Sequence, residues 1–156
     1  MLVILAGAVI AIMGLSLVET VDAQAKEPMI GTWKMDVTKS RLDGPTPRSE
    51  VRTYVVTGQG IKATKKGVDS AGKPYLQEWM ISYDGQDRQI VNPEADSVSR
   101  RMLDPYTAEY TLKKAGKVVT VGRRSISKDG TTMTITAKGS NAKGQPIDTI
   151  EVFERQ

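Results

Sequence analysis

Turn-forming sequences interrupt this chain at short, fairly regular intervals from residue 30 onward, and this spacing limits the folds open to it. Between the turns, apolar and polar side chains alternate, which is the pattern of half-buried β-strands rather than helices. Loops this short make neighbouring strands antiparallel. The turns are Gly58-Gln59-Gly60, Ala71-Gly72-Lys73-Pro74, Asp84-Gly85, Asn92-Pro93, Asp104-Pro105, Ala115-Gly116, Asp129-Gly130 and Asn141-Ala142-Lys143-Gly144.

Strands are therefore expected over 31–37, 50–57, 61–68, 75–83, 86–91, 97–103, 108–114, 117–127, 131–140 and 147–154. So many strands, each with one buried face, leave a wide exposed edge unless the sheet curls round on itself. We predict an all-β fold, an antiparallel up-and-down barrel of about 8–10 strands. A two-sheet sandwich is the alternative, although sandwiches usually need longer crossing connections. The longest predicted loop is 38–48.

The first residues differ from the rest of the chain. Residues 2–18 carry no charge, and small residues follow at positions suited to signal peptidase, so cleavage is expected after Ala23 or, alternatively, after Ala25. No Lys or Arg precedes the apolar run. We predict an export signal over 1–23 and a barrel domain over 29–156, placed in the periplasm or secreted. A retained membrane anchor is the alternative.

The composition limits the chemistry of the chain. It contains no Cys and no His, so it lacks disulfides, the commonest general base and the commonest transition-metal ligand. Its net charge of +4 is spread along the strands and turns, and it has only eight aromatic residues to interleave with the basic ones. We therefore predict no catalysis, no metal site, no cofactor and no nucleic-acid partner.

The start of the first predicted strand reads Gly31-Thr32-Trp33-Lys34. A Gly-x-Trp at this place, followed by a meander of about ten strands, resembles the calycins, which comprise the lipocalins and the fatty-acid-binding proteins. The likeness is closest to small bacterial exported proteins described as lipocalin-like. Further matching pieces are Lys39-Ser40, Ser127-Lys128-Asp129-Gly130, Lys138-Gly139 and Gly144-Gln145-Pro146.

This resemblance implies that Trp33 closes one end of the barrel and packs near an arginine from a late strand, for which Arg123 and Arg124 are the candidates. It also implies a capacity for small apolar or amphipathic ligands. Fatty-acid-binding proteins hold the ligand carboxylate with an Arg-x-Tyr in the last strand, but the aligned residues here are Glu151-Val152-Phe153. The resemblance therefore implies a fold without implying that mechanism.

Three aromatic residues, Tyr75, Trp79 and Tyr83, share one face of the predicted strand 75–83. Such a stripe either packs a core or lines an apolar cavity. We take all three as candidate ligand contacts.

Two pairs of adjacent arginines, Arg100-Arg101 and Arg123-Arg124, lie inside predicted strands. Because successive side chains point to opposite faces, one arginine of each pair should point inward. An inward cation without a partner is a candidate anchor for an acidic group. The sequence does not decide between the members of a pair; we take Arg100 and Arg124 as candidate ligand residues, and Arg123 with Trp33 as candidate barrel-closing residues.

Two functions remain open. The first is a barrel that holds a small apolar or amphipathic ligand. The second is a structural or accessory protein whose outer surface contacts envelope or membrane-complex partners. A cavity of about 300 Å³ or more would favour the first, and a filled interior the second.

Overall fold

In the computed structural model, residues 27–141 and 143–156 are described, so the predicted export segment lies outside them. All ten predicted strands are confirmed. No helix in these two ranges is long and apolar enough to cross a membrane. The strands are β1 (Gly31–Met35), β2 (Ser49–Thr57), β3 (Gly60–Val68), β4 (Pro74–Ile81), β5 (Arg88–Gln89), β6 (Ser97–Asp104), β7 (Thr107–Lys114), β8 (Lys117–Ile126), β9 (Thr132–Ser140) and β10 (Pro146–Arg155).

The strands form a single antiparallel sheet in the order β4-β3-β2-β1-β10-β9-β8-β7-β6-β5. Consecutive strands are neighbours, as in the predicted meander, with one exception: β4 and β5 lie at the two ends of the order. The first and last strands pair instead, through Trp33 opposite Arg155 and Met35 opposite Phe153. The curled, antiparallel all-β architecture is confirmed, and its unpaired seam lies between β4 and β5.

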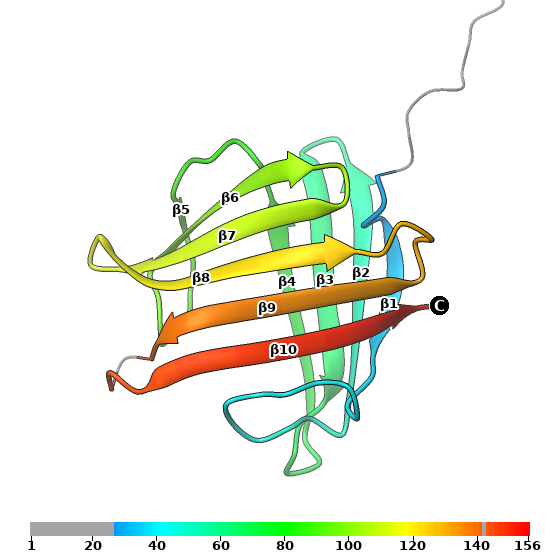
Figure 1. The fold of residues 1–156 in the computed structure, drawn as a ribbon, viewed down its shortest axis with the longest axis horizontal. Helices are drawn as coiled ribbons and strands as arrows, with labels where there is room; N and C mark the ends of the chain where they lie inside the picture. The colour runs from blue at the N-terminus through cyan, green and yellow to red at the C-terminus, as the bar shows by residue number, and fades with distance from the viewer. Residues whose placement is uncertain (1–26, 142) are drawn as a thin grey trace, which may run out of the picture.

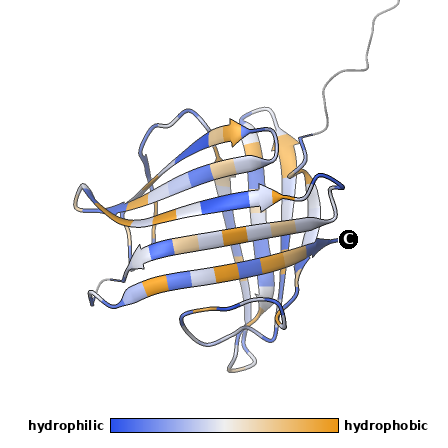
Figure 2. Cartoon of the chain, viewed as in Figure 1, coloured by the Kyte–Doolittle hydropathy of each residue, from blue (hydrophilic) through white to orange (hydrophobic). Residues whose placement is uncertain are grey.

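Curling divides the sheet into two layers (Figure 1). Strands β6–β10 run across the front of the view, and β1–β4 stand behind them at a steep angle. Figure 2 shows polar and apolar residues alternating along the front strands. One side chain in two therefore faces the space between the layers, and this space holds both the core and the candidate site.

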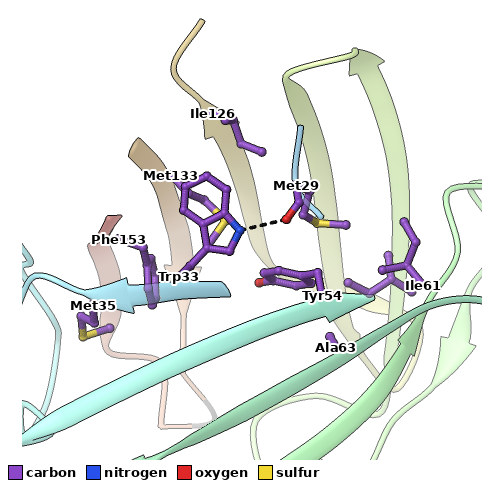
Figure 3. Packing of buried hydrophobic residues seen from close by; sticks show 10 residues of the cluster. Met29, Trp33, Met35, Tyr54, Ile61, Ala63, Ile126, Met133 and Phe153 are labelled. Carbon is purple, nitrogen blue, oxygen red and sulfur yellow. Dashed lines mark hydrogen bonds between the residues drawn. The ribbon is translucent and has the colours of Figure 1, made fainter. Parts of the chain in front are cut away.

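The apolar core is concentrated around the end of the barrel that Trp33 occupies (Figure 3). Trp33, Met133 and Phe153 are each 0% exposed. The indole Nε1 of Trp33 donates a hydrogen bond to the backbone oxygen of Met29 at 2.8 Å, so its only polar group is satisfied inside the core. Trp33 is therefore packed inside the core, and we name the buried residues of this core the Trp33 cluster. Its members are Met29, Trp33, Met35, Tyr54, Ile61, Ala63, Ile81, Ile126, Met133 and Phe153.

The arginine over Trp33 is Arg155, in place of the expected Arg123 or Arg124. Its guanidinium carbon lies 4.1 Å from the indole ring centroid, because the two residues are directly opposite in the β1–β10 pair. Arg155 also donates from Nε to the oxygen of Gly130 at 2.6 Å, from Nη1 to that of Ile30 at 2.8 Å, and from Nη2 to that of Pro28. Through Arg155, the last strand is therefore hydrogen-bonded both to the segment before β1 and to the turn between β8 and β9.

The expected loop is present at residues 36–48 and covers the edge of β10 that β1 leaves free. Arg41 and Ile150 exchange two backbone hydrogen bonds of 2.7 Å. Ser40 Oγ accepts a further bond from the Val152 amide at 3.0 Å. The short β1 is thereby extended by a loop that satisfies the backbone of its longer partner.

Replacement of Arg155 tests its role in closing the barrel. Arg155→Met keeps most of the side-chain volume but leaves three carbonyl oxygens and the Trp33 ring without their cation. We expect the free energy of unfolding in urea to fall by about 2–3 kcal/mol. Arg41→Met is the matched control, because the Arg41 side chain is 61% exposed and forms an ion pair with Asp148 at 3.3 Å. It should change stability by less than about 0.5 kcal/mol; equal losses in the two variants would contradict the assignment.

Candidate ligand-binding site

The inner face of β2 carries charged residues into the barrel. Glu50 and Arg52 alternate with outward residues and are only 2% and 8% exposed. Arg52 Nε donates to Glu50 Oε1 at 2.7 Å, and its Nη2 donates to Glu151 Oε2 on β10, also at 2.7 Å. Its guanidinium carbon lies 4.6 Å from the Phe153 ring centroid. Arg52 therefore joins the two layers, and two carboxylates neutralise its charge.

The other oxygen of Glu50 completes a charge cluster next to the Trp33 cluster. Glu50 Oε2 lies 3.0 Å from Lys65 Nζ and accepts a hydrogen bond from the Tyr75 hydroxyl at 2.8 Å. Burial by itself raises the pKa of Glu50, but Arg52 and Lys65 outweigh it and hold the pKa below the ordinary 4.5. Glu50 is therefore ionised and fully partnered, which is the condition for a buried carboxylate to be tolerated.

A cavity of about 280 Å³ lies between the two layers, beside these clusters. Its walls come from β2, β4 and Tyr83 on one side and from β6–β10 on the other. Apolar side chains such as Ile81, Val98 and Leu112 make up much of the lining. The interior is thus only partly filled, and a small molecule of mixed polarity has room in it.

Arg100 and Arg124 both line this cavity. In the described part of the chain, no carboxylate lies within 4.0 Å of either guanidinium. Arg124 is 7% exposed and its Nε has no hydrogen-bond partner. Burial lowers the pKa of Arg100 below its ordinary value. Two cations therefore face one cavity without the counter-ion that buried charges normally have.

Tyrosines complete the polar part of the lining. The Tyr83 hydroxyl accepts a hydrogen bond from Arg124 Nη1, and the guanidinium carbon lies 5.5 Å from the Tyr83 ring centroid. Burial raises the pKa of Tyr83, and it raises that of Tyr110 to about 12, so both hydroxyls keep their protons at neutral pH. Opposite Tyr110 stands Gly122, where an added Cβ would lie 2.1 Å from the ring. The absence of a side chain at Gly122 makes room for this ring at the cavity wall.

The structure brings together four of the five ligand residues chosen from the sequence. Trp79, Tyr83, Arg100 and Arg124 line the cavity, whereas Tyr75 lies outside its lining and binds Glu50. Arg123 points outward, with its side chain 55% exposed and its Nη2 3.9 Å from Glu109 Oε2. The contact with the Trp33 ring that was expected of Arg123 or Arg124 is made by Arg155.

The other ten lining residues were missed, and the polar ones among them include Arg52, Glu109, Tyr110 and Glu151. The alternation of β2 gives a signal for Arg52, since it shares a face with Tyr54. The inward position of Tyr110 follows from its pairing opposite Gly122, and the sequence alone does not determine this strand register. In the described residues, no three acidic side chains gather where they could hold a metal ion.

The partnered state of Glu50 predicts how stability depends on pH. Because its folded-state pKa is below the unfolded value of 4.5, its contribution is complete above that value and is lost as pH falls through the folded-state pKa. Glu50→Gln should lower the free energy of unfolding at neutral pH and make its decline between about pH 5 and pH 3 shallower than in the parent.

Urea unfolding at a series of pH values measures this dependence. Glu154→Gln is the control, because it removes a carboxyl group whose side chain is 55% exposed. A Glu50→Gln profile parallel to that of the parent protein would show that Glu50 is not held ionised by its neighbours.

Comparison with known proteins identifies solved structures that are similar to this fold. No family model and no curated protein matches the sequence. Among solved structures, zebrafish ileal bile acid-binding protein complexed with cholic acid matches with a TM-score of 0.50 and 12% identity, over 83% of this chain and 99% of that one. As-p18, an extracellular fatty acid binding protein, has a TM-score of 0.45 and 13% identity, over 83% and 97% of the two chains. At this identity the first match shows a shared fold, and it confirms the calycin-like architecture expected from the sequence.

Proposed function

We propose that this protein binds a small amphipathic molecule with one acidic group, and that Arg100 and Arg124 hold that group inside the barrel. The observation that carries the proposal is that the buried Arg124 and the half-buried Arg100 line one cavity and, in the described residues, have no carboxylate within 4.0 Å. Each destabilises the empty protein, because desolvation of a charge is unfavourable. A ligand carboxylate would offset this penalty in bidentate or charge-assisted hydrogen bonds.

The volume of the cavity limits the size of the ligand that it can hold. At the packing density of protein interiors, 280 Å³ encloses roughly 200 Å³ of ligand, on the order of a dozen non-hydrogen atoms. Decanoic acid, with a carboxylate and a linear apolar chain, matches this size. Its chain would lie against Ile81, Val98 and Leu112, and its carboxylate would lie between the two arginines.

We propose binding without catalysis. The chain has neither His nor Cys, and its most buried carboxylate, Glu50, is engaged as an ionised partner of Arg52 and Lys65. The cavity lining also holds protonated phenols and two carboxylates, Glu109 and Glu151, which pair with Arg101 and Arg52. Within the described ranges, Arg100 and Arg124 have no such partner, which suits them to recognition of an anion. We also propose that the apolar segment 1–23 directs export, on the basis of the sequence alone.

The adjacent arginine pairs supply matched variants. Arg100→Met and Arg124→Met each remove an inward cation, whereas Arg101→Met and Arg123→Met remove outward ones that are 65% and 55% exposed. By isothermal titration calorimetry at neutral pH, each inward variant should bind decanoic acid about 10- to 100-fold more weakly than the parent. The outward variants should bind as the parent does. Equal affinities in all four variants would overturn the proposal.

Decanol distinguishes the acid group from the apolar chain. The parent protein should prefer decanoic acid over decanol, and Arg100→Met should lose this preference. The same variant should be at least as stable as the parent in urea, because it replaces a half-buried cation without a carboxylate partner by an apolar side chain. A marked loss of stability in Arg100→Met would point instead to a structural role for Arg100.

A further inference from the structure

We propose that the ligand enters and leaves the barrel through the seam between β4 and β5, with its acid group leading. This inference rests on the proposed function and adds the route that serves the cavity.

The seam is the place where the barrel wall can open without breaking strand pairing. Every other pair of neighbours around the described sheet, including β1 and β10, is joined by backbone hydrogen bonds. The ladder ends at β4 on one side and at β5 on the other, and β5 has only two residues, both exposed. Figure 1 shows β5 as a short segment beside β6, at the margin of the front layer. Separation of β4 from β5 therefore requires no ladder hydrogen bond to break.

A groove of about 820 Å³ lies along this seam, lined by residues of β4, of β5 and of the segment that follows β5. Five residues line both the groove and the inner cavity, so the two spaces are separated by one layer of side chains. Shifts of these side chains would connect them. The shared residues are Trp79, Ile81, Val98, Arg100 and Leu112.

Two other parts of the barrel interior are filled by side chains. The Trp33 cluster packs the interior around β1, the end of β8 and the start of β9. The charge cluster of Glu50, Arg52, Lys65 and Tyr75 occupies the interior between the starts of β2 and β4. Passage through either would expose buried apolar surface or separate buried ion pairs, both of which are unfavourable.

Arginines mark the route from solvent to the cavity. Arg88 lines only the groove, and its side chain is 57% exposed and paired with Asp84. Arg100 lines both spaces, and Arg124 lines only the inner cavity, where it is 7% exposed. Attraction for an anion therefore grows inward, as solvent screening weakens and carboxylate partners are lost. This order suits entry with the acid group first.

Because the chain has no cysteine, a bulky group can be attached at one chosen position. Met80 and Leu76 both lie on the outer face of β4 and are 44% and 66% exposed, but only Met80 lines the groove. We compare Met80→Cys and Leu76→Cys, each labelled with a polyethylene-glycol maleimide. The probe is decanoic acid with a terminal bromine, whose quenching of Trp79 fluorescence is followed by stopped flow.

The Met80→Cys conjugate should bind and release the probe at least tenfold more slowly than the Leu76→Cys conjugate. Its dissociation constant should stay within about twofold of the control, since an obstructed route slows both directions alike. Equal rates in the two conjugates would overturn the inference while leaving the proposed function intact. If calorimetry shows that the unlabelled parent binds no decanoic acid, the proposed function itself fails.

A charge variant tests the outer end of the route. Arg88→Gln should slow association of the probe about two- to fivefold, weaken its dependence on salt, and leave dissociation nearly unchanged. Arg41→Gln is the matched control, because Arg41 is also an exposed arginine paired with an aspartate but lies beside β10. An association rate in Arg88→Gln equal to that of Arg41→Gln would contradict entry past Arg88.

Discussion

The pairing of the first strand with the last organises the rest of this structure. A meander of ten strands has two free ends, and joining β1 to β10 leaves the only break in the described ladder between β4 and β5. Trp33 and Arg155 lie opposite each other at this junction, so the closing pair is also the centre of the apolar core. Because closure is achieved there, the barrel can keep a seam elsewhere.

Closure of the barrel also explains why its interior has an apolar part, a charged part and a cavity. Once the layers face each other, the Trp33 cluster fills one part of the space and the charge cluster around Glu50 fills another. Both are internally satisfied, the first by apolar packing and the second by four paired groups. The remaining space is the cavity, and in the described residues two cations that line it, Arg100 and Arg124, have no carboxylate within 4.0 Å. Arg100 and Arg124 are therefore difficult to explain by stability, and this is the basis of the proposal that they bind an anion.

Much of this fold could be predicted from the sequence, because strand period and turn residues are local signals. The alternation also showed that one of Arg100 and Arg101 had to point inward. The identity of the arginine over Trp33 could not be predicted, because it depends on the register that sets Arg155 opposite Trp33 across the whole length of the chain. Tyr75 shows the same limit: it shares a face with Trp79, but Glu50, twenty-five residues away, holds its hydroxyl outside the cavity lining.

The central claim is that a ligand carboxylate binds between the guanidinium groups of Arg100 and Arg124, which line the cavity. A ¹³C NMR titration of decanoic acid labelled at the carboxyl carbon, bound to the parent protein, measures the pKa of that group directly. Two adjacent cations stabilise the ionised form, so the bound acid should titrate well below the free acid. A bound carboxyl with an unchanged or raised pKa would mean that the ligand lies in an apolar environment away from Arg100 and Arg124, and the account given for these residues would be wrong.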